Sequence, residues 1–317
     1  MKNPIPREDI YKYYWYFASE RQNIFYNRFS GKAKPWTNDK ILQNYKFCNV
    51  FRATDRVSQY LIKNVIYTPI DYDAKDRLFQ IIFFRIFSNI ETWESLVRIL
   101  GRPPLVRDLK FNTLEEALDL VRQRNNRLYT NAFILCANNA YGKSIKHLNH
   151  IELFRDMFLK GDIFESVLNS DRLKNIYSAL HSYPLLGDFM SYQISIDINY
   201  SELVDFSEND FTKAGPGALR GIKKVFSDTN GLSPEAVVMW MVENQESESI
   251  RLGLPPPHLW GRGLHAIDCQ GLFCEVDKYC REAAPELASA RKRIKSKFSE
   301  STDKINFFFP PKWGLNL

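Results

Sequence analysis

The chain has 317 residues, 44% of them hydrophobic, and its 43 basic and 37 acidic side chains give a net charge of +6. This composition predicts a globular protein with a substantial core and excludes a disordered chain. The most apolar run, residues 79–87, is too short to span a bilayer, so we expect a cytoplasmic protein without a membrane segment. The excess of basic charge permits a nucleic acid partner without establishing one.

Helical spacing of apolar residues dominates the first two thirds of the chain. No strand-like alternation is sustained before residue 190, and Thr113 and Glu116 form a capping box. The sequence therefore predicts an all-α fold. In chain order, we expect helices over residues 7–30, 53–66, 73–87, 92–100, 114–124, 130–139, 151–158, 163–168 and 172–181.

Metal and nucleotide motifs give no support for a cofactor. The five cysteines and five histidines show no spacing typical of zinc or iron–sulfur ligands, and we expect reduced thiols. Residues 140–144 end like a phosphate-binding loop, but Ala137 stands where that loop needs glycine, and no strand precedes it. We therefore expect no metal, and no nucleotide hydrolysis at this segment.

Two compact turns, residues 186–189 and 214–218, each precede a predicted helix. A turn that opens onto a helix N-terminus presents free N–H groups to an anion such as a phosphate. We therefore expect DNA to bind around both turns. The candidates are Gly187, Tyr192 and Gln193 at the first turn, and Gly215, Gly217 and Arg220 at the second.

The first turn resembles the helix–hairpin–helix of DNA glycosylases, although Phe189 replaces the second glycine of that motif. The resemblance implies that main-chain amides grip a DNA phosphate, often through a bound monovalent cation. It also implies an essential aspartate about twenty residues beyond the hairpin. That position is Asp210, with Asp205 as the near alternative. If the second turn is the hairpin instead, the aspartate is Asp268. These acids could also simply cap helices.

Five separated phrases carry a closer resemblance that covers most of the chain. It is to the α-glutamyl/putrescinyl thymine pyrophosphorylase family and the helical domain of 5-hydroxymethyluracil DNA kinases, which are related to helix–hairpin–helix glycosylases. A bacterial anti-phage glycosylase that removes glucosylated 5-hydroxymethylcytosine belongs to the same group. The phrases are KPWTNDKIL (34–42), FCNVFRATDRVSQYL (47–61), GDFMSYQISIDINYS (187–201), NDFTKAGPGALRGIKK (209–224) and IDCQGLFCEVDKYCR (267–281).

Further candidate residues lie within these phrases. Trp36 and Tyr192 could stack on a flipped base, with core packing as the alternative. Asn49, Arg52 and Arg56 follow one side of a predicted helix, where they could read a base edge or form an ion-pair network with Asp55. The last long helix adds candidates that could close a pocket: Asp268, Gln270, Asp277 and Lys278.

The resemblance implies an all-α, helix–hairpin–helix glycosylase-like bundle with a groove between two helical subdomains. We expect one subdomain over residues 40–200, ending in the hairpin 184–193, and a second built from 1–39 and 201–317. We expect no cofactor other than a monovalent cation at the hairpin. The expected partner is double-stranded DNA with modified bases, with no membrane and no obligate protein partner.

The expected activity is that of a monofunctional DNA N-glycosylase in anti-phage defence. It would flip out a bulky modified pyrimidine, such as glucosylated 5-hydroxymethylcytosine, with Asp210, Asp268 or Asp277 as the catalytic carboxylate. Ser191 and Leu219 replace the lysine that strand-nicking relatives carry after the hairpin. Two alternatives stay open: a pyrophosphorylase-type enzyme that hypermodifies phosphorylated hydroxymethyluracil in DNA, and a non-catalytic reader of modified DNA.

Overall fold

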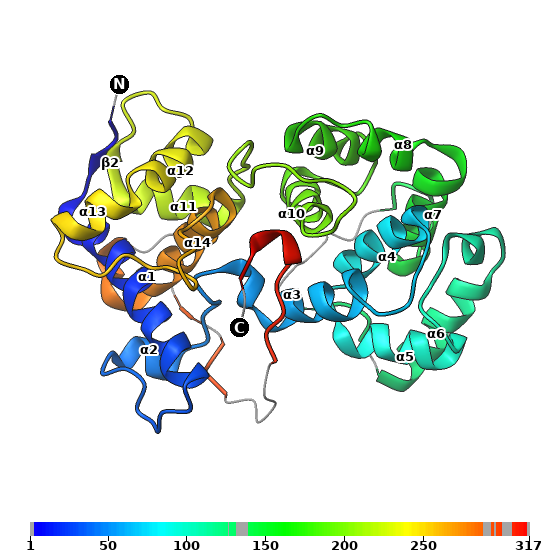
Figure 1. Cartoon of the computed structure of the whole chain (residues 1–317), viewed down its shortest axis with the longest axis horizontal. Helices are drawn as coiled ribbons and strands as arrows, with labels where there is room; N and C mark the ends of the chain where they lie inside the picture. Colours follow the sequence, from blue (N-terminus) through cyan, green and yellow to red (C-terminus); the bar gives the residue numbers. More distant parts are fainter. Residues whose placement is uncertain are drawn as a thin grey trace. The chain divides into compact units, whose positions relative to one another are not determined.

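The computed structural model describes residues 3–125, 127–130, 139–287, 293–294, 296–299 and 306–315. Within these residues the secondary structure is helical apart from one small antiparallel sheet, in which β1 (Ile5–Pro6) pairs with β2 (Phe226–Asp228) (Figure 1). The predicted all-α class is therefore confirmed. Residues 131–138 of the helix expected over 130–139 lie outside the described residues.

The chain divides into two compact units. Unit 1 consists of Met1–Asp55 and Phe211–Asn306, and unit 2 of Arg56–Asp210 and Phe307–Leu317. In the described part of the chain, none of the helices is both long enough and apolar enough to cross a membrane.

Unit 1 is centred on two long helices. Tyr14 and Trp15 of α1 are fully buried, and the Tyr14 ring lies 4.8 Å from that of Phe273 on α14. The Tyr14 hydroxyl donates to the carbonyl oxygen of Cys269, 3.3 Å away. The helices of unit 1 are α1 (Glu8–Phe29), α2 (Lys40–Asn44), α11 (Pro216–Val225), α12 (Pro234–Glu243), α13 (Gln245–Arg251) and α14 (Ala266–Ala283), with a 3₁₀ turn at Arg52–Thr54.

Helices α11 and α14 pack together through two glycines. A Cβ atom on Gly221 would lie 2.0 Å from the backbone oxygen of Phe273, and one on Gly217 would lie 2.1 Å from the Cys274 sulfur. The absent side chains let the two helix backbones meet at a distance that any other residue would prevent. Gly217, predicted to contact DNA, therefore lies inside α11 and has a packing role.

Unit 2 is built around α4, whose residues from Leu78 to Phe87 are all buried. Arg85 in this run is paired with Asp197 on α10, and both side chains are fully buried. Its helices are α3 (Arg56–Tyr60), α4 (Ala74–Phe87), α5 (Ile90–Leu100), α6 (Thr113–Asn125), α7 (Lys146–Arg155), α8 (Ile163–Leu168), α9 (Leu173–His181) and α10 (Asp188–Asn199). Two π-helical turns (Leu61–Ile66, Asp156–Lys160) and two 3₁₀ turns (Val106–Lys110, Pro311–Trp313) complete it.

Candidate functional site

The Asp277 carboxylate, one of the predicted catalytic groups, is fully buried among three cations. It lies 3.1 Å from Arg220 and 3.0 Å from Lys224, both on α11, and 2.9 Å from Arg281 one turn further along α14. Burial raises the pKa of this carboxyl, but hydrogen bonds from Arg281 and Lys224 outweigh burial and hold the pKa below its usual value. Asp277 therefore stays ionised and ties α11 to α14.

Asp268 caps the start of α14 and holds a distant segment against it. One carboxylate oxygen accepts from the backbone N–H of His265 at 3.1 Å, and the other accepts from that of Arg52 at 2.9 Å. Gln270, two residues further along the helix, is also buried. The Asp268 carboxylate thus fixes the position of residues 47–55 on α14.

Glu275 and Lys278 hold the other end of that segment. The Glu275 carboxylate accepts from the backbone N–H of Cys48 at 3.0 Å and from the Lys278 ammonium at 2.7 Å. The ammonium also lies 4.5 Å from the centroid of the Phe47 ring, within range of a cation–π interaction. The neighbouring Glu275 carboxylate raises the pKa of the exposed Cys48 thiol, so the thiol is neutral.

Arg21, Asn49 and Asp55 complete a polar cluster on this segment. Arg21 donates to the Asn49 side-chain oxygen at 2.5 Å, and the Asn49 backbone N–H donates to Asp55 at 2.9 Å. Burial raises the pKa of the Asp55 carboxyl to about 6. A carboxyl that titrates near neutral pH can take up and release a proton during a reaction. We call Arg21, Asn49, Asp55, Glu275 and Lys278 the 47–55 site.

Sequence reasoning found part of this site. Asn49 and Lys278 were candidates, but Arg21 and Glu275 were missed, and Asp55 was considered only as a partner in an ion-pair network. Arg21 lies on a long aromatic helix where nothing local distinguishes it from other surface arginines. The available signal was the group of polar residues within 48–56, which alternate with the buried Val50, Phe51 and Ala53 just before a helix.

The predicted residues of unit 2 have different surroundings. Asp210 is paired with Arg172 at 2.8 Å. Gly187 caps α10, but Asp188 occupies the first position of that helix, where its carboxylate accepts from Tyr177 at 2.7 Å. A carboxylate at this position repels a phosphate. The other candidates of unit 2 are Tyr192 and Gln193, which are buried, and Arg56, which is exposed.

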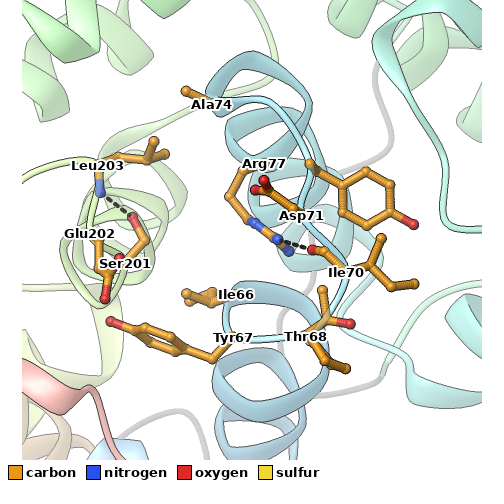
Figure 2. A pocket seen from close by; sticks show the side chains of 12 residues that line it. Ile66, Tyr67, Thr68, Ile70, Asp71, Ala74, Arg77, Ser201, Glu202 and Leu203 are labelled. Atoms are coloured by element: carbon orange, nitrogen blue, oxygen red, sulfur yellow. Dashed lines mark hydrogen bonds between the residues drawn. The ribbon is translucent and has the colours of Figure 1, made fainter.

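Unit 2 also contains a pocket of about 430 Å³ between residues 66–77 and 201–203 (Figure 2). Its one cation, Arg77, donates to backbone oxygens within the unit, including that of Ile70 at 3.0 Å. Its other charged lining residues are Asp71 and Glu202, both acidic. This pocket is therefore poorly suited to an anionic nucleic acid.

Unit 1 contains a second pocket, of about 340 Å³, next to the 47–55 site. Arg21 and Phe47 line it, and so does Trp36, one of the predicted base-stacking residues. The structure thus brings Trp36, Asn49, Arg52, Asp268 and Lys278 into one unit around the segment 47–55. Gly215, another of the predicted DNA contacts, caps α11. Within the described residues we find no cluster of side chains that could hold a metal ion.

Most of this helical chain matches one known protein family. The chain matches the family described as 5-hmdU DNA kinase, helical domain, over residues 8–289, and it is a member of that family. Among curated proteins it is similar to the 5-hmdU DNA kinase of Bacillus phage SP10, with 26% identity over 333 aligned residues. The match covers 98% of this chain but 51% of the relative, so the chain spans about half the relative's length. No solved structure matches.

The comparisons confirm the predicted kinase helical-domain resemblance and overturn the predicted activity. A monofunctional DNA N-glycosylase was expected, but the relative is named a kinase, so that expectation is wrong. The geometry gives a physical reason for doubting it as well. A glycosylase needs a carboxylate available to a positively charged sugar, whereas Asp277 and Asp210 are already paired with cations of this chain.

Proposed function

We propose that this chain acts on DNA containing 5-hydroxymethyl-2′-deoxyuridine, as a base-hypermodification enzyme whose substrate is the phosphorylated form of that base. The support for the substrate is the similarity of nearly the whole chain to a protein named for 5-hmdU DNA. The support for the reaction, and the observation that carries the proposal, is Asp55: burial raises the pKa of its carboxyl to about 6, and it accepts from the Asn49 backbone N–H near Arg21 and Glu275.

The proposed reaction is a substitution at the 5-methylene carbon of the base. A nucleophile with an acidic proton forms a bond to this carbon, and the carbon–oxygen bond to the phosphate group breaks. Asp55 accepts the proton of the nucleophile, which requires a carboxyl that is partly ionised at neutral pH. Lys278 and Arg21 stabilise the negative charge that develops on the departing phosphate.

The test is to incubate the protein with duplexes that carry thymine, 5-hydroxymethyluracil or its phosphorylated form, together with amine and amino acid nucleophiles. The DNA is then digested and its nucleosides are separated by mass. We expect loss of the phosphorylated nucleoside and a new substituted nucleoside. Asp55→Asn should abolish this product, whereas Asp9→Asn, an exposed change on α1 of the same unit, should leave it unchanged.

Two other outcomes would contradict the proposal. Addition of phosphate to 5-hydroxymethyluracil in the presence of ATP would show that this chain is itself a kinase. Selective binding of modified DNA without any product, unaltered by Asp55→Asn, would show a non-catalytic reader.

A further inference from the structure

The pocket of unit 1 combines positive charge with aromatic surface. Three of its lining residues are cations, Arg21, Arg28 and Lys34, and none of its described lining residues is acidic. Its volume of about 340 Å³ falls in the range of small-molecule sites, roughly 300–1,000 Å³. Because cations around a concave surface raise the local concentration of anions, the pocket favours an anionic ligand.

Trp36 is the fixed centre of this pocket. Its indole N–H donates to the backbone oxygen of Lys32 at 2.8 Å, and its own backbone oxygen accepts from the Asn27 side chain at 3.1 Å. Arg28 and Lys34 each lie 5.0 Å from the ring centroid. An aromatic ring held by hydrogen bonds at both its edge and its backbone is a rigid surface for stacking.

A buried donor points to a ligand as well. Arg21 uses one terminal nitrogen of its guanidinium to bond Asn49, while the other terminal nitrogen is buried and has no hydrogen-bond partner. A buried donor without an acceptor costs about 1–3 kcal/mol, which an incoming acceptor would relieve. Arginine suits this role because its planar fork matches the oxygens of a phosphate.

We propose that this pocket binds a nucleoside phosphate, with the base against Trp36 and the phosphate on Arg21, Arg28 and Lys34. Four aromatic side chains line it, those of Trp36, Tyr45, Phe47 and Phe298, and the amide of Asn44 can bond a base edge. Aromatic surface, an amide and cations together fit a nucleotide better than a bare anion. The inference rests on the proposed function in one respect, because Arg21 and Phe47 connect the pocket to the 47–55 site.

The ligand has two sources, a free nucleotide or a nucleotide within DNA. The experiment is calorimetric titration at constant salt with thymidine 5′-monophosphate, thymidine and inorganic phosphate in turn. We expect the nucleotide to bind, and each of its halves to bind at least about tenfold more weakly. A short single-stranded oligonucleotide with phosphorylated hydroxymethyluracil is then added as a competitor. If this oligonucleotide displaces the bound nucleotide, and the same oligonucleotide with thymine in place of the modified base does not, the natural ligand is a nucleotide within DNA.

Variants test the location of the bound nucleotide. Arg28→Met and Lys34→Met change exposed residues and should each weaken nucleotide binding about tenfold. Lys12→Met removes an exposed charge elsewhere on α1, outside the pocket lining, and should change binding less than about twofold. Equal effects of all three changes would indicate general charge attraction and overturn the proposal, as would failure of the nucleotide to bind at millimolar concentration.

The proposed function and this inference fail in different ways. If modified DNA is converted to product and the pocket variants are as active as the unaltered protein, the pocket proposal is wrong and the function stands. If thymidine 5′-monophosphate binds in the pocket but modified DNA gives no product, the pocket stands and the function is wrong.

Discussion

Replacement of Gly221 by alanine tests the packing of α11 on α14. The added Cβ atom would lie 2.0 Å from the Phe273 carbonyl oxygen, far inside van der Waals contact. The obstacle is backbone in the middle of a helix, so α11 must move away as a whole and its contact with α14 must loosen. Overpacking typically costs 1–3 kcal/mol and sometimes more, whereas the helix propensity of alanine returns about 1 kcal/mol.

We therefore expect a net loss of about 2 kcal/mol for Gly221→Ala, which lowers the melting temperature by about 4–8 °C. Gly271→Ala is the matched control in the partner helix α14, since no atom lies within 4 Å of its added Cβ. At Gly271 only the higher helix propensity of alanine acts, and we expect the free energy of unfolding to rise by up to about 1 kcal/mol.

The assay is urea unfolding followed by circular dichroism, with thermal melts alongside. The two substitutions are chemically identical, so their opposite signs isolate the contact with Phe273. If Gly221→Ala is as stable as the unaltered protein, the close approach of α11 and α14 is wrong. A loss for Gly271→Ala as large as that for Gly221→Ala would refute the steric explanation.

Three further predictions concern buried charges. Asp197→Ala leaves Arg85 buried opposite no carboxylate and should cost about 3–5 kcal/mol in urea unfolding, whereas the double change Arg85→Met, Asp197→Leu should cost far less. The pKa of Asp55 is raised to about 6, so its folded form holds a proton that the unfolded form releases. The stability that this bound proton contributes is fully present below about pH 4. It is lost as the pH rises to 6, which lowers the free energy of unfolding by up to about 3 kcal/mol, and Asp55→Asn should remove this dependence on pH. His150 has the opposite sign: burial lowers its pKa to about 3, so it destabilises the fold as pH falls below 6.5, by about 2 kcal/mol at pH 5. His150→Asn should flatten that decline, and an unchanged slope in either variant would contradict the assignment.

The helical class was predictable because it follows from local patterns. Residues 74–87 are apolar on nearly every face, which predicts a helix surrounded by others, and the structure buries each residue from Leu78 to Phe87. What the pattern could not predict is the partner of Arg85. Asp197 lies 112 positions further along the chain, and a pairing at that separation depends on how α4 and α10 fold together.

The candidate site shows the same limit. The segment 47–56 was selected for its polar residues, but its significance depends on contacts with residues more than 200 positions away, such as Glu275 and Asp268. Gly217 was selected because it lies in a turn that opens onto a helix N-terminus, while the structure places the Cys274 sulfur where its side chain would be. A glycine's use depends on what approaches it, and sequence spacing does not reveal that.

The distribution of charge in unit 1 decides which carboxylate is available for chemistry. Asp277 lies among three cations, and proton uptake there would leave those cations uncompensated in a buried place, so it is held ionised. Asp55 has two neighbouring arginines, Arg21, which is bonded to Asn49, and Arg52, and burial outweighs the attraction of both. Two aspartates of the same unit are therefore pushed in opposite directions, one fixed as an anion and one able to exchange a proton near neutral pH. This difference in pKa favours Asp55 as the reactive group, whereas Asp277 holds Arg220 and Lys224 in place.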